Sequence, residues 1–188
     1  MTDRRIRWFP LAVAAALLAA LSGCGVLVKQ SPSEHNAADV VFGYRMLPHH
    51  EQAVRVASLV AGHGASAAVG QLAEKITSER RPQIDQLSAM LRGWGTQPAQ
   101  MPDQNAPALA RLPGMLSEAQ LADLGRARGP AFDHQFLTMM IAHDRGAVDM
   151  AGEEVQQGLN GQALNLARAI VTNQRAEIER MRGMLAGS

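Results

Sequence analysis

An internal duplication constrains the fold of this chain more than any other feature. The segment from Phe42 to Ala57 matches the segment from Phe136 to Ala151 without a gap, and His49 aligns with His143, an offset of 94 residues. Apolar residues further along keep the same offset: the pairs include Leu72 and Leu166, Ile76 and Ile170, Ile84 and Ile178, and Leu91 and Leu185. Chance does not readily hold one register over about fifty positions, so each copy is predicted to be one helical hairpin.

The spacing of apolar residues predicts α-helices. In the first segment of each copy they recur every three or four positions, giving Phe42, Met46, His49, Ala53 and Val56, then Phe136, Met140, His143, Ala147 and Met150. Glycine-containing breaks at 62–64 and 158–161 supply the turns within the hairpins. Four amphipathic helices of roughly 25 residues can bury their stripes only against one another. The expected fold is an all-α four-helix bundle with approximate twofold symmetry.

The two copies, about 39–92 and 130–185, are separated by a segment that cannot continue a helix. Residues 93–129 include Pro98, Pro102, Pro107 and Pro113 and are expected to form a long surface crossover. A capping-box pattern from Ser117 to Gln120 predicts one short helix within it. Pro48 and Pro82 fall inside the helical patterns, where each removes a backbone donor.

The N-terminus is predicted to direct export and lipidation. Residues 1–23 combine an arginine-containing start with a short apolar run, as in a secretory signal, and Leu-Ser-Gly-Cys at 21–24 resembles the bacterial lipobox. Cys24 would then be the lipidated first residue, 24–36 a flexible tether, and 37–188 the bundle domain. We expect membrane lipid as a partner through the acylated Cys24 and a location at the extracytoplasmic face of the cell membrane.

Charge and cysteine content exclude several classes of protein. Residues 1–23 carry three basic and one acidic residue, so the remainder has 15 basic and 16 acidic residues and lacks the basic field that nucleic-acid binding needs. The single cysteine excludes an internal disulfide and multi-thiolate metal sites. Nucleophile motifs, phosphate loops and dinucleotide turns are absent from the sequence, so an enzyme is not expected.

The duplicated histidines are the candidate functional residues. On a helical wheel His143 lies in the middle of the apolar stripe, and the duplication gives His49 the same place. Met46, Met140 and Met150 lie on or beside these stripes, while His50 and Asp144 share one flank. If the first helices of the two copies pack together, two imidazoles and several thioethers converge inside the bundle.

Imidazole and thioether are the ligands that copper prefers, Cu(I) above all, whereas Cu(II) also accepts Asp144. The candidate metal ligands are therefore Met46, His49, His50, Met140, His143, Asp144 and Met150. A di-iron site is disfavoured because no Glu-x-x-His occurs, and a structural zinc site is poorly supported without thiolates. The competing interpretation is that these histidines and methionines only pack the core. His35, His63 and His134 are expected to lie in solvent.

At these residues the chain resembles the domain-of-unknown-function 305 family, from about Asp39 to Leu185. The matching residues include Phe42, Met46, Pro48, His49, His50, Trp94, Gly95, Phe132, Asp133, Phe136, Met140, His143, Gly146, Ala147, Met150 and Ala151. The resemblance implies a secreted or lipoprotein domain with a ferritin-like helical bundle, and some members are associated with copper binding and copper tolerance.

Two positions depart from the family pattern. Asp144 stands where the second histidine of the second pair is usual, and Val56 replaces a methionine. Both remove a soft donor. Three consequences stay open: weaker Cu(I) binding, a shift towards Cu(II), or loss of the metal role. Two functions remain: a membrane-tethered protein that sequesters or passes on copper, and a structural or scaffolding envelope lipoprotein without metal.

Overall fold

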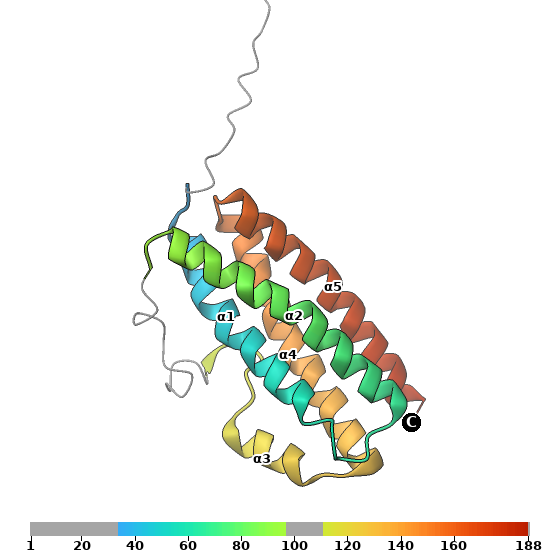
Figure 1. Cartoon of the computed structure of the whole chain (residues 1–188). Helices are drawn as coiled ribbons and strands as arrows, with labels where there is room; N and C mark the ends of the chain where they lie inside the picture. Colours follow the sequence, from blue (N-terminus) through green and yellow to red (C-terminus); the bar gives the residue numbers. More distant parts are fainter. Residues whose placement is uncertain (1–33, 97–110, 188) are drawn as a thin grey trace, which may run out of the picture.

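All regular elements in the described part of the chain are helices (Figure 1). The computed structural model describes residues 34–96 and 111–187. The helices are α1 (Ala37–Ser58), α2 (Ala67–Gly93), α3 (Glu118–Arg126), α4 (Gly129–Gln157) and α5 (Gly161–Ala186). The all-α prediction is thus confirmed. Among the described helices, none is long and apolar enough to cross a membrane.

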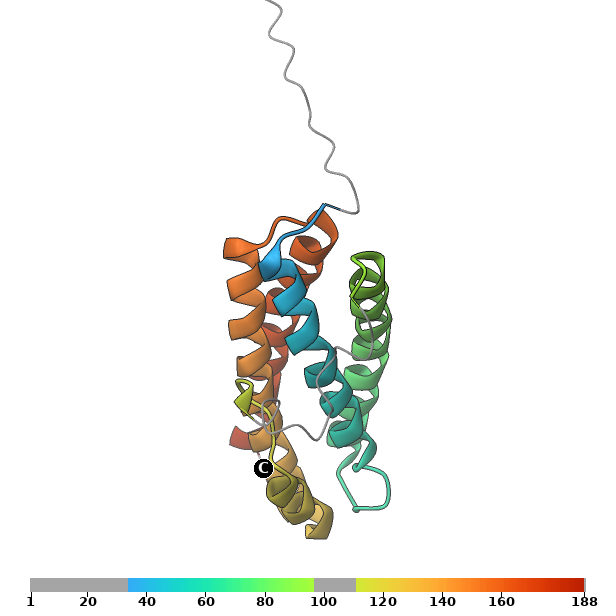
Figure 2. The same ribbon diagram turned by 90° about the vertical axis from the view of Figure 1, so that its left-hand side faces the viewer.

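The four long helices form two hairpins that pack side by side (Figures 1 and 2). Helix α1 pairs with α2 and α4 pairs with α5, while α1 and α4 join the two hairpins along the middle of the bundle. The short helix α3 lies at the end where α4 begins. Because α1 and α4 are the first helices of the two copies, this packing brings the two apolar stripes with their histidines together.

The turns and caps follow the sequence signals. Gly62 and Gly64 have φ of 81° and 65° in the α1–α2 turn, a backbone region that glycine adopts without strain. Ser117 and Gln120 form the expected capping box at α3. Pro48 and Pro82 lie inside α1 and α2 as predicted.

The two copies also cap each other's second helix. The carboxylate of Asp39 in α1 accepts from the backbone N–H of Asn160 at the start of α5, at 2.9 Å. The equivalent residue, Asp133 in α4, accepts from the N–H of Ser66 at the start of α2, at 3.0 Å. Both positions are the N-caps of their helices, so each aspartate satisfies a backbone donor there and ties the two hairpins together.

We expect Asp133→Ala to lower the free energy of unfolding by about 1 kcal/mol, the usual cost of losing a carboxylate at a helix N-terminus. Asp149→Ala is the matched control, because Asp149 is an exposed aspartate on the same helix. Urea unfolding of both variants measures the difference. Equal stability of the two variants would show that the contact between Asp133 and Ser66 contributes nothing.

The start of the described chain is packed on the bundle. The side-chain amide of Asn36 caps α1 and donates to the carbonyl of Gln157, at 2.8 Å. His35 stacks on Trp94 with ring centroids 4.9 Å apart, so the prediction that His35 lies in solvent is wrong. His63 is also half-buried, with its ring 4.8 Å from that of Phe132, because the α1–α2 turn folds onto the start of α4. His134 is exposed, as predicted.

A strap from the crossover covers α1 and α4 near their middle. Gln52 of α1 accepts from the N–H of Leu116 at 2.8 Å and donates to its carbonyl at 2.9 Å. On the α4 side the strap passes over Gly146, where an ideal Cβ would lie 1.9 Å from the carbonyl oxygen of Pro113. We call residues 112–116 the strap.

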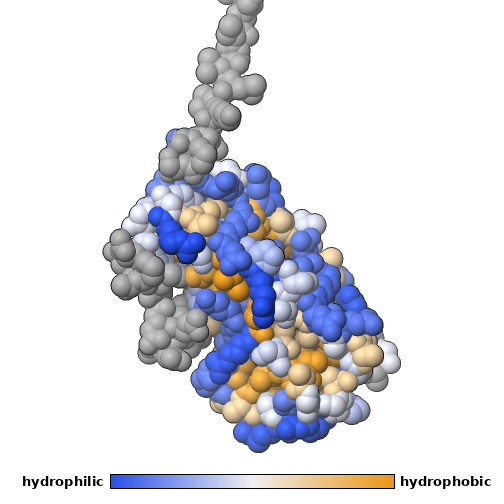
Figure 3. Space-filling model, viewed as in Figure 1, coloured by the Kyte–Doolittle hydropathy of each residue, from blue (hydrophilic) through white to orange (hydrophobic). Residues whose placement is uncertain are grey.

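The face shown in Figure 3 is mainly hydrophilic, and apolar residues gather on it over the end of α1 and the start of α2. A groove of about 540 Å³ lies there, between the end of α1 and α2. Its walls carry small side chains, such as Ala57, Ala61 and Ala73, beside Glu74 and Arg81.

Candidate metal centre

Three histidines meet in the interior between α1 and α4. The rings of His49 and His143 face each other with centroids 3.8 Å apart and an angle of 36° between their planes. The ring of His50 lies 6.4 Å from that of His49. All three side chains are buried, His49 and His50 at 0% exposure and His143 at 1%. The convergence of the duplicated histidines predicted from the sequence is therefore present.

The imidazoles are rich in nitrogens without a partner. Nε2 of His49 donates to the carbonyl of Pro113 at 3.1 Å, and because a carbonyl only accepts, Nδ1 of His49 keeps its lone pair. Within residues 34–96 and 111–187, that Nδ1 and both ring nitrogens of His50 and His143 make no hydrogen bond of normal geometry, although Gln83 lies close enough to His50, and the backbone of His49 close enough to His143, to raise their pKa values. Buried polar atoms are usually hydrogen-bonded, and each neutral imidazole keeps one lone-pair nitrogen, so each of the three rings has one nitrogen available to a ligand.

Burial keeps these histidines uncharged. It lowers the pKa of His49 to about 3, with further lowering by the charges of Arg80 and Arg45, whereas the hydrogen bond to Pro113 opposes it. Burial likewise lowers the pKa of His50 and His143 well below 6.5, and the charge of Arg80 acts in the same direction on both. Neutral imidazole is the form that binds metal ions, so no proton has to leave before a metal is bound.

The predicted thioethers are buried but do not form one group. Met46 and Met150 pack with Phe42 and Ala147 in one apolar cluster. Met140 packs with Ala53 and Phe136 in the other. Each methionine is 2% exposed or less. The sequence places all three inside the bundle, but it does not distinguish the core layer in which each one lies.

The carboxylate of Asp144 faces the guanidinium of Arg80. Its Oδ1 lies 3.4 Å from Nη2 of Arg80, and the same Nη2 donates to Oε1 of Glu177 at 3.0 Å. The amide of Gln174 is placed to donate to Oδ1 of Asp144 at 3.2 Å. Burial raises the pKa of Asp144 well above its usual value, which Arg80 opposes and Glu177 reinforces.

Sequence reasoning missed this network, which we call the Arg80 network: Arg80, Asp144, Gln174 and Glu177. The signal was present in the duplication, since at the same offset His50 aligns with Asp144, Arg80 with Gln174, and Gln83 with Glu177. Polar residues at equivalent positions of both second helices would have marked a buried polar layer.

The donor set fits a soft metal ion, but the rings are not arranged as ligands in this structure. A ring nitrogen binds metal in the plane of its ring, whereas His49 and His143 present their faces to each other. Among the described residues, no three histidine, cysteine, aspartate or glutamate side chains are grouped so as to hold a metal ion. Holding an ion between His49 and His143 would require the two rings to turn. Cys24 lies outside the described residues.

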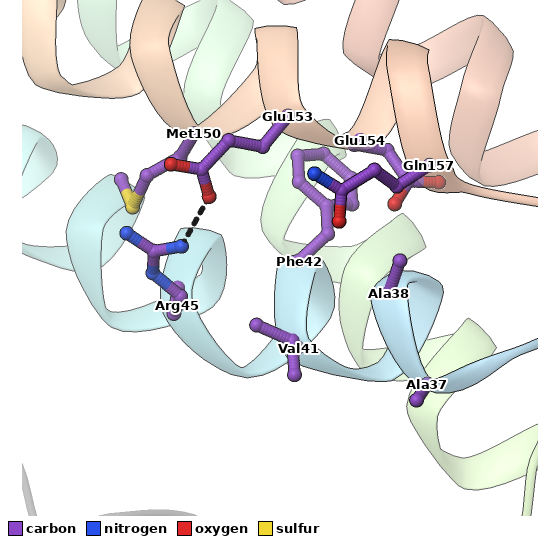
Figure 4. Close-up of a pocket in the computed structure, with 9 residues that line it drawn as sticks. All are labelled: Ala37, Ala38, Val41, Phe42, Arg45, Met150, Glu153, Glu154 and Gln157. Carbon is purple, nitrogen blue, oxygen red and sulfur yellow. Dashed lines mark hydrogen bonds and ion pairs between the residues drawn. The ribbon is translucent and has the colours of Figure 1, made fainter.

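A second polar site lies where α1 begins and α4 ends (Figure 4). A pocket of about 250 Å³ there is crossed by an ion pair between Arg45 and Glu153, at 2.5 Å. Glu154, 1% exposed, also lines it. Burial raises the pKa of Glu154 to about 8, and the neighbouring Asp39 carboxylate raises it too. At neutral pH Glu154 is therefore largely protonated, which avoids two carboxylate charges in contact.

Comparison with known proteins supports the fold. A DUF305 fragment from Deinococcus radiodurans is 35% identical, with a TM-score of 0.73 and a match covering 81% of this chain and 98% of that one. A DUF305 protein from Streptomyces coelicolor is 29% identical, with a TM-score of 0.72 and coverage of 80% and 91%. CopM in its Cu(I)-bound form is 23% identical, with a TM-score of 0.67 and coverage of 79% and 96%.

CopM has also been solved in Cu(II)-bound and Ag-bound forms. A search of curated proteins found no match. The model of the domain of unknown function DUF305 matches residues 39–185, which agrees with the resemblance seen in the sequence. This match covers both helical hairpins and the crossover between them. The chain belongs to the DUF305 family.

Proposed function

We propose that this protein is a lipoprotein, anchored through Cys24 at the extracytoplasmic face of the cell membrane, that binds and sequesters copper and catalyses no reaction. The observation that carries the proposal is the set of three buried, neutral imidazoles of His49, His50 and His143, whose ring nitrogens make no hydrogen bond of normal geometry apart from Nε2 of His49. The lipobox pattern at 21–24 supports the anchor. The likeness to CopM, solved with copper and silver, supports the choice of metal.

In this proposal His49, His50 and His143 supply the first donors. Met46, Met140 and Met150 are the candidate thioether donors, and Asp144 is the candidate oxygen donor. A bound copper ion would be kept from water and from redox chemistry by the surrounding core. The imidazoles are neutral without metal, and Pro113 fixes the tautomer of His49 by accepting from its Nε2.

The alternative is a structural or scaffolding envelope lipoprotein in which the histidines only pack. The facing rings of His49 and His143, 3.8 Å apart, favour this alternative because two neutral imidazoles in contact can fill a core without metal. It predicts that no metal ion changes the melting temperature. It also predicts a protein partner that co-purifies after mild detergent extraction.

One equivalent of Cu(I), supplied under reducing conditions, is expected to raise the melting temperature of the protein. A ligand present at 100 times its Kd, binding only the native state, adds about 2.7 kcal/mol, which is roughly 5 to 10 °C for a domain of this size. The double variant His49→Ala, His143→Ala should lose this shift. Calorimetry with and without Cu(I) makes the measurement.

His134→Ala is the matched control, because His134 is an exposed histidine on α4 and should leave the shift unchanged. A double variant that keeps the copper affinity of the unmodified protein would overturn the assignment of the site. If copper changes the melting temperature of neither the unmodified protein nor any variant, the packing alternative holds.

A further inference from the structure

The groove between the end of α1 and the start of α2 is open to another molecule. It has a volume of about 540 Å³ and lies among the apolar residues that Figure 3 shows over these two segments. Most of the side chains that line it are small. The smallest lining residue is Gly70, where an added Cβ would have nothing within 4 Å. There is therefore room for a helix of a partner to lie close to α2.

The hydroxyl groups on this face of α2 need no outside partner. The hydroxyl of Thr77 donates to the carbonyl of Ala73, and that of Ser78 donates to the carbonyl of Lys75, both at 2.9 Å. Covering Thr77 and Ser78 with another protein would leave neither hydroxyl without a hydrogen bond. This part of the surface can therefore be buried without the penalty of an unsatisfied polar group.

Two opposite charges flank these hydroxyl groups. Glu74 and Arg81 are exposed, line the groove and lie seven residues apart. That separation is two turns of α2, or about 10.5 Å along one face of the helix. Among the described residues neither side chain forms an ion pair, whereas the neighbouring Lys75 pairs with Glu79. Both charges are thus available to a partner.

The arrangement of the two charges is complementary to itself. Thr77 and Ser78 lie midway between them. When two copies of α2 lie antiparallel about a twofold axis at this midpoint, Glu74 of each copy faces Arg81 of the other. Parallel helices in the same register would instead place like charges opposite each other. Charge complementarity therefore favours a second copy of this chain, in the antiparallel orientation, as the occupant of the groove.

The second hairpin differs at the equivalent positions in both size and charge. Its two charged residues there are Arg168 and Arg175, which have the same sign. Larger apolar residues replace the small ones, and two of them, Val155 and Val171, pack against the apolar core. At the offset of 94 the pairs are Gly70 and Leu164, Thr77 and Val171, and Ala61 and Val155. The self-complementary surface therefore belongs to the first hairpin.

We propose that this groove is the interface of a homodimer, in which the α2 helices of two copies pack antiparallel and Glu74 of each copy pairs with Arg81 of the other. The proposal goes beyond the proposed function and does not depend on metal binding. Exposed ion pairs each contribute little, so we expect a weak dimer with a Kd between about 10 μM and 1 mM.

Sedimentation equilibrium of the full chain, in detergent micelles matched to the density of the solvent, measures this Kd. Glu74→Arg and Arg81→Glu each replace two ion pairs with two contacts between like charges, and each should raise the Kd about tenfold or more. The double variant Glu74→Arg, Arg81→Glu exchanges the charges and restores both pairs. Its Kd should return to within about threefold of that of the unmodified protein.

Arg175→Glu is the matched control, because Arg175 is exposed at the position equivalent to Arg81 and the net charge changes by the same amount. It should leave the Kd unchanged. Gly70→Gln tests the groove separately from its charges, since a neutral side chain would then occupy the space that the partner needs. This variant should also raise the Kd about tenfold. Thermal melting shows whether each variant is folded.

A chain that stays monomeric at about 1 mM overturns the proposal, because a second copy is then not the occupant. A Kd that Arg81→Glu and Arg175→Glu change equally, or that Gly70→Gln leaves unchanged, places the interface elsewhere and overturns it too. A double variant as weak as the single variants rules out the antiparallel pairing. If Gly70→Gln does not fold, the charge variants decide. The measurements use metal-free protein, so their failure leaves the proposed copper binding untouched.

Discussion

Replacing Gly146 with alanine is expected to lower the free energy of unfolding by about 3 kcal/mol, the upper end of the usual cost of overpacking a core. A Cβ at this position would lie 1.9 Å from the carbonyl oxygen of Pro113 and 2.7 Å from the backbone nitrogen of Gly114. Both are backbone atoms, so no side chain can turn aside to make room. The strap would have to move away from α4.

That movement would break several contacts at once. Gln52 holds Leu116 through two hydrogen bonds, and Pro113 accepts from His49. A displaced strap would leave Gln52 and Nε2 of His49 buried without their partners, which adds to the steric cost. The same movement is expected to change the environment of the candidate metal centre.

Gly152→Ala is the matched control, because Gly152 lies on the same helix and has no atom within 4 Å of an added Cβ. Alanine there should leave stability unchanged or raise it by up to about 1 kcal/mol, since alanine has the higher helix propensity. Urea unfolding of the two variants should differ by several kcal/mol. Similar midpoints would show that the strap yields at little cost.

The parts of this fold that the sequence predicts are those governed by periodicity and local chemistry. Spacing by three and four residues marks all four long helices, and the offset of 94 between His49 and His143 relates the two hairpins. The capping box at Ser117 and Gln120 marks α3. These signals lie within a few residues of one another or repeat, so one sequence suffices to read them.

The strap and the Arg80 network depend on contacts between distant parts of the chain. Gln52 meets Leu116 across 64 residues, and Arg80 meets Glu177 across 97. A single buried arginine gives no periodic signal, because its place on a helical wheel predicts an exposed side chain. Asp144 shows the same difficulty: its flank position was predicted, but the guanidinium that it faces comes from the other hairpin.

Acid is expected to destabilise this protein steeply, because the three buried histidines resist protonation. Their folded pKa values lie below the unfolded value near 6.5, at about 3 for His49. As the pH falls below 6.5 the unfolded chain takes up protons that the folded chain does not. The free energy of unfolding therefore falls with decreasing pH from about 6.5 towards the folded pKa values.

Two carboxyl groups act in the opposite direction over part of this range. Glu154 has a folded pKa of about 8 and Asp144 a strongly raised one, so the folded chain takes up their protons first as the pH falls. Their effect fades as the pH falls through and below the unfolded carboxyl values, at about 4. Each histidine that stays unprotonated in the folded chain contributes a slope of at most about 1.4 kcal/mol per pH unit, and the three contributions have the same sign.

The variant His143→Gln replaces one imidazole with a side chain that is neutral at every pH. Its free energy of unfolding below about pH 6 should fall less steeply than that of the unmodified protein, by at most about 1.4 kcal/mol per pH unit. His134→Gln is the control, because His134 is exposed on the same helix and should keep the full slope. Ordinary surface carboxylates titrate alike in all three proteins, so the difference in slope isolates His143. Urea unfolding at a series of pH values supplies the slopes, and equal slopes in the two variants would mean that His143 accepts its proton in the folded state.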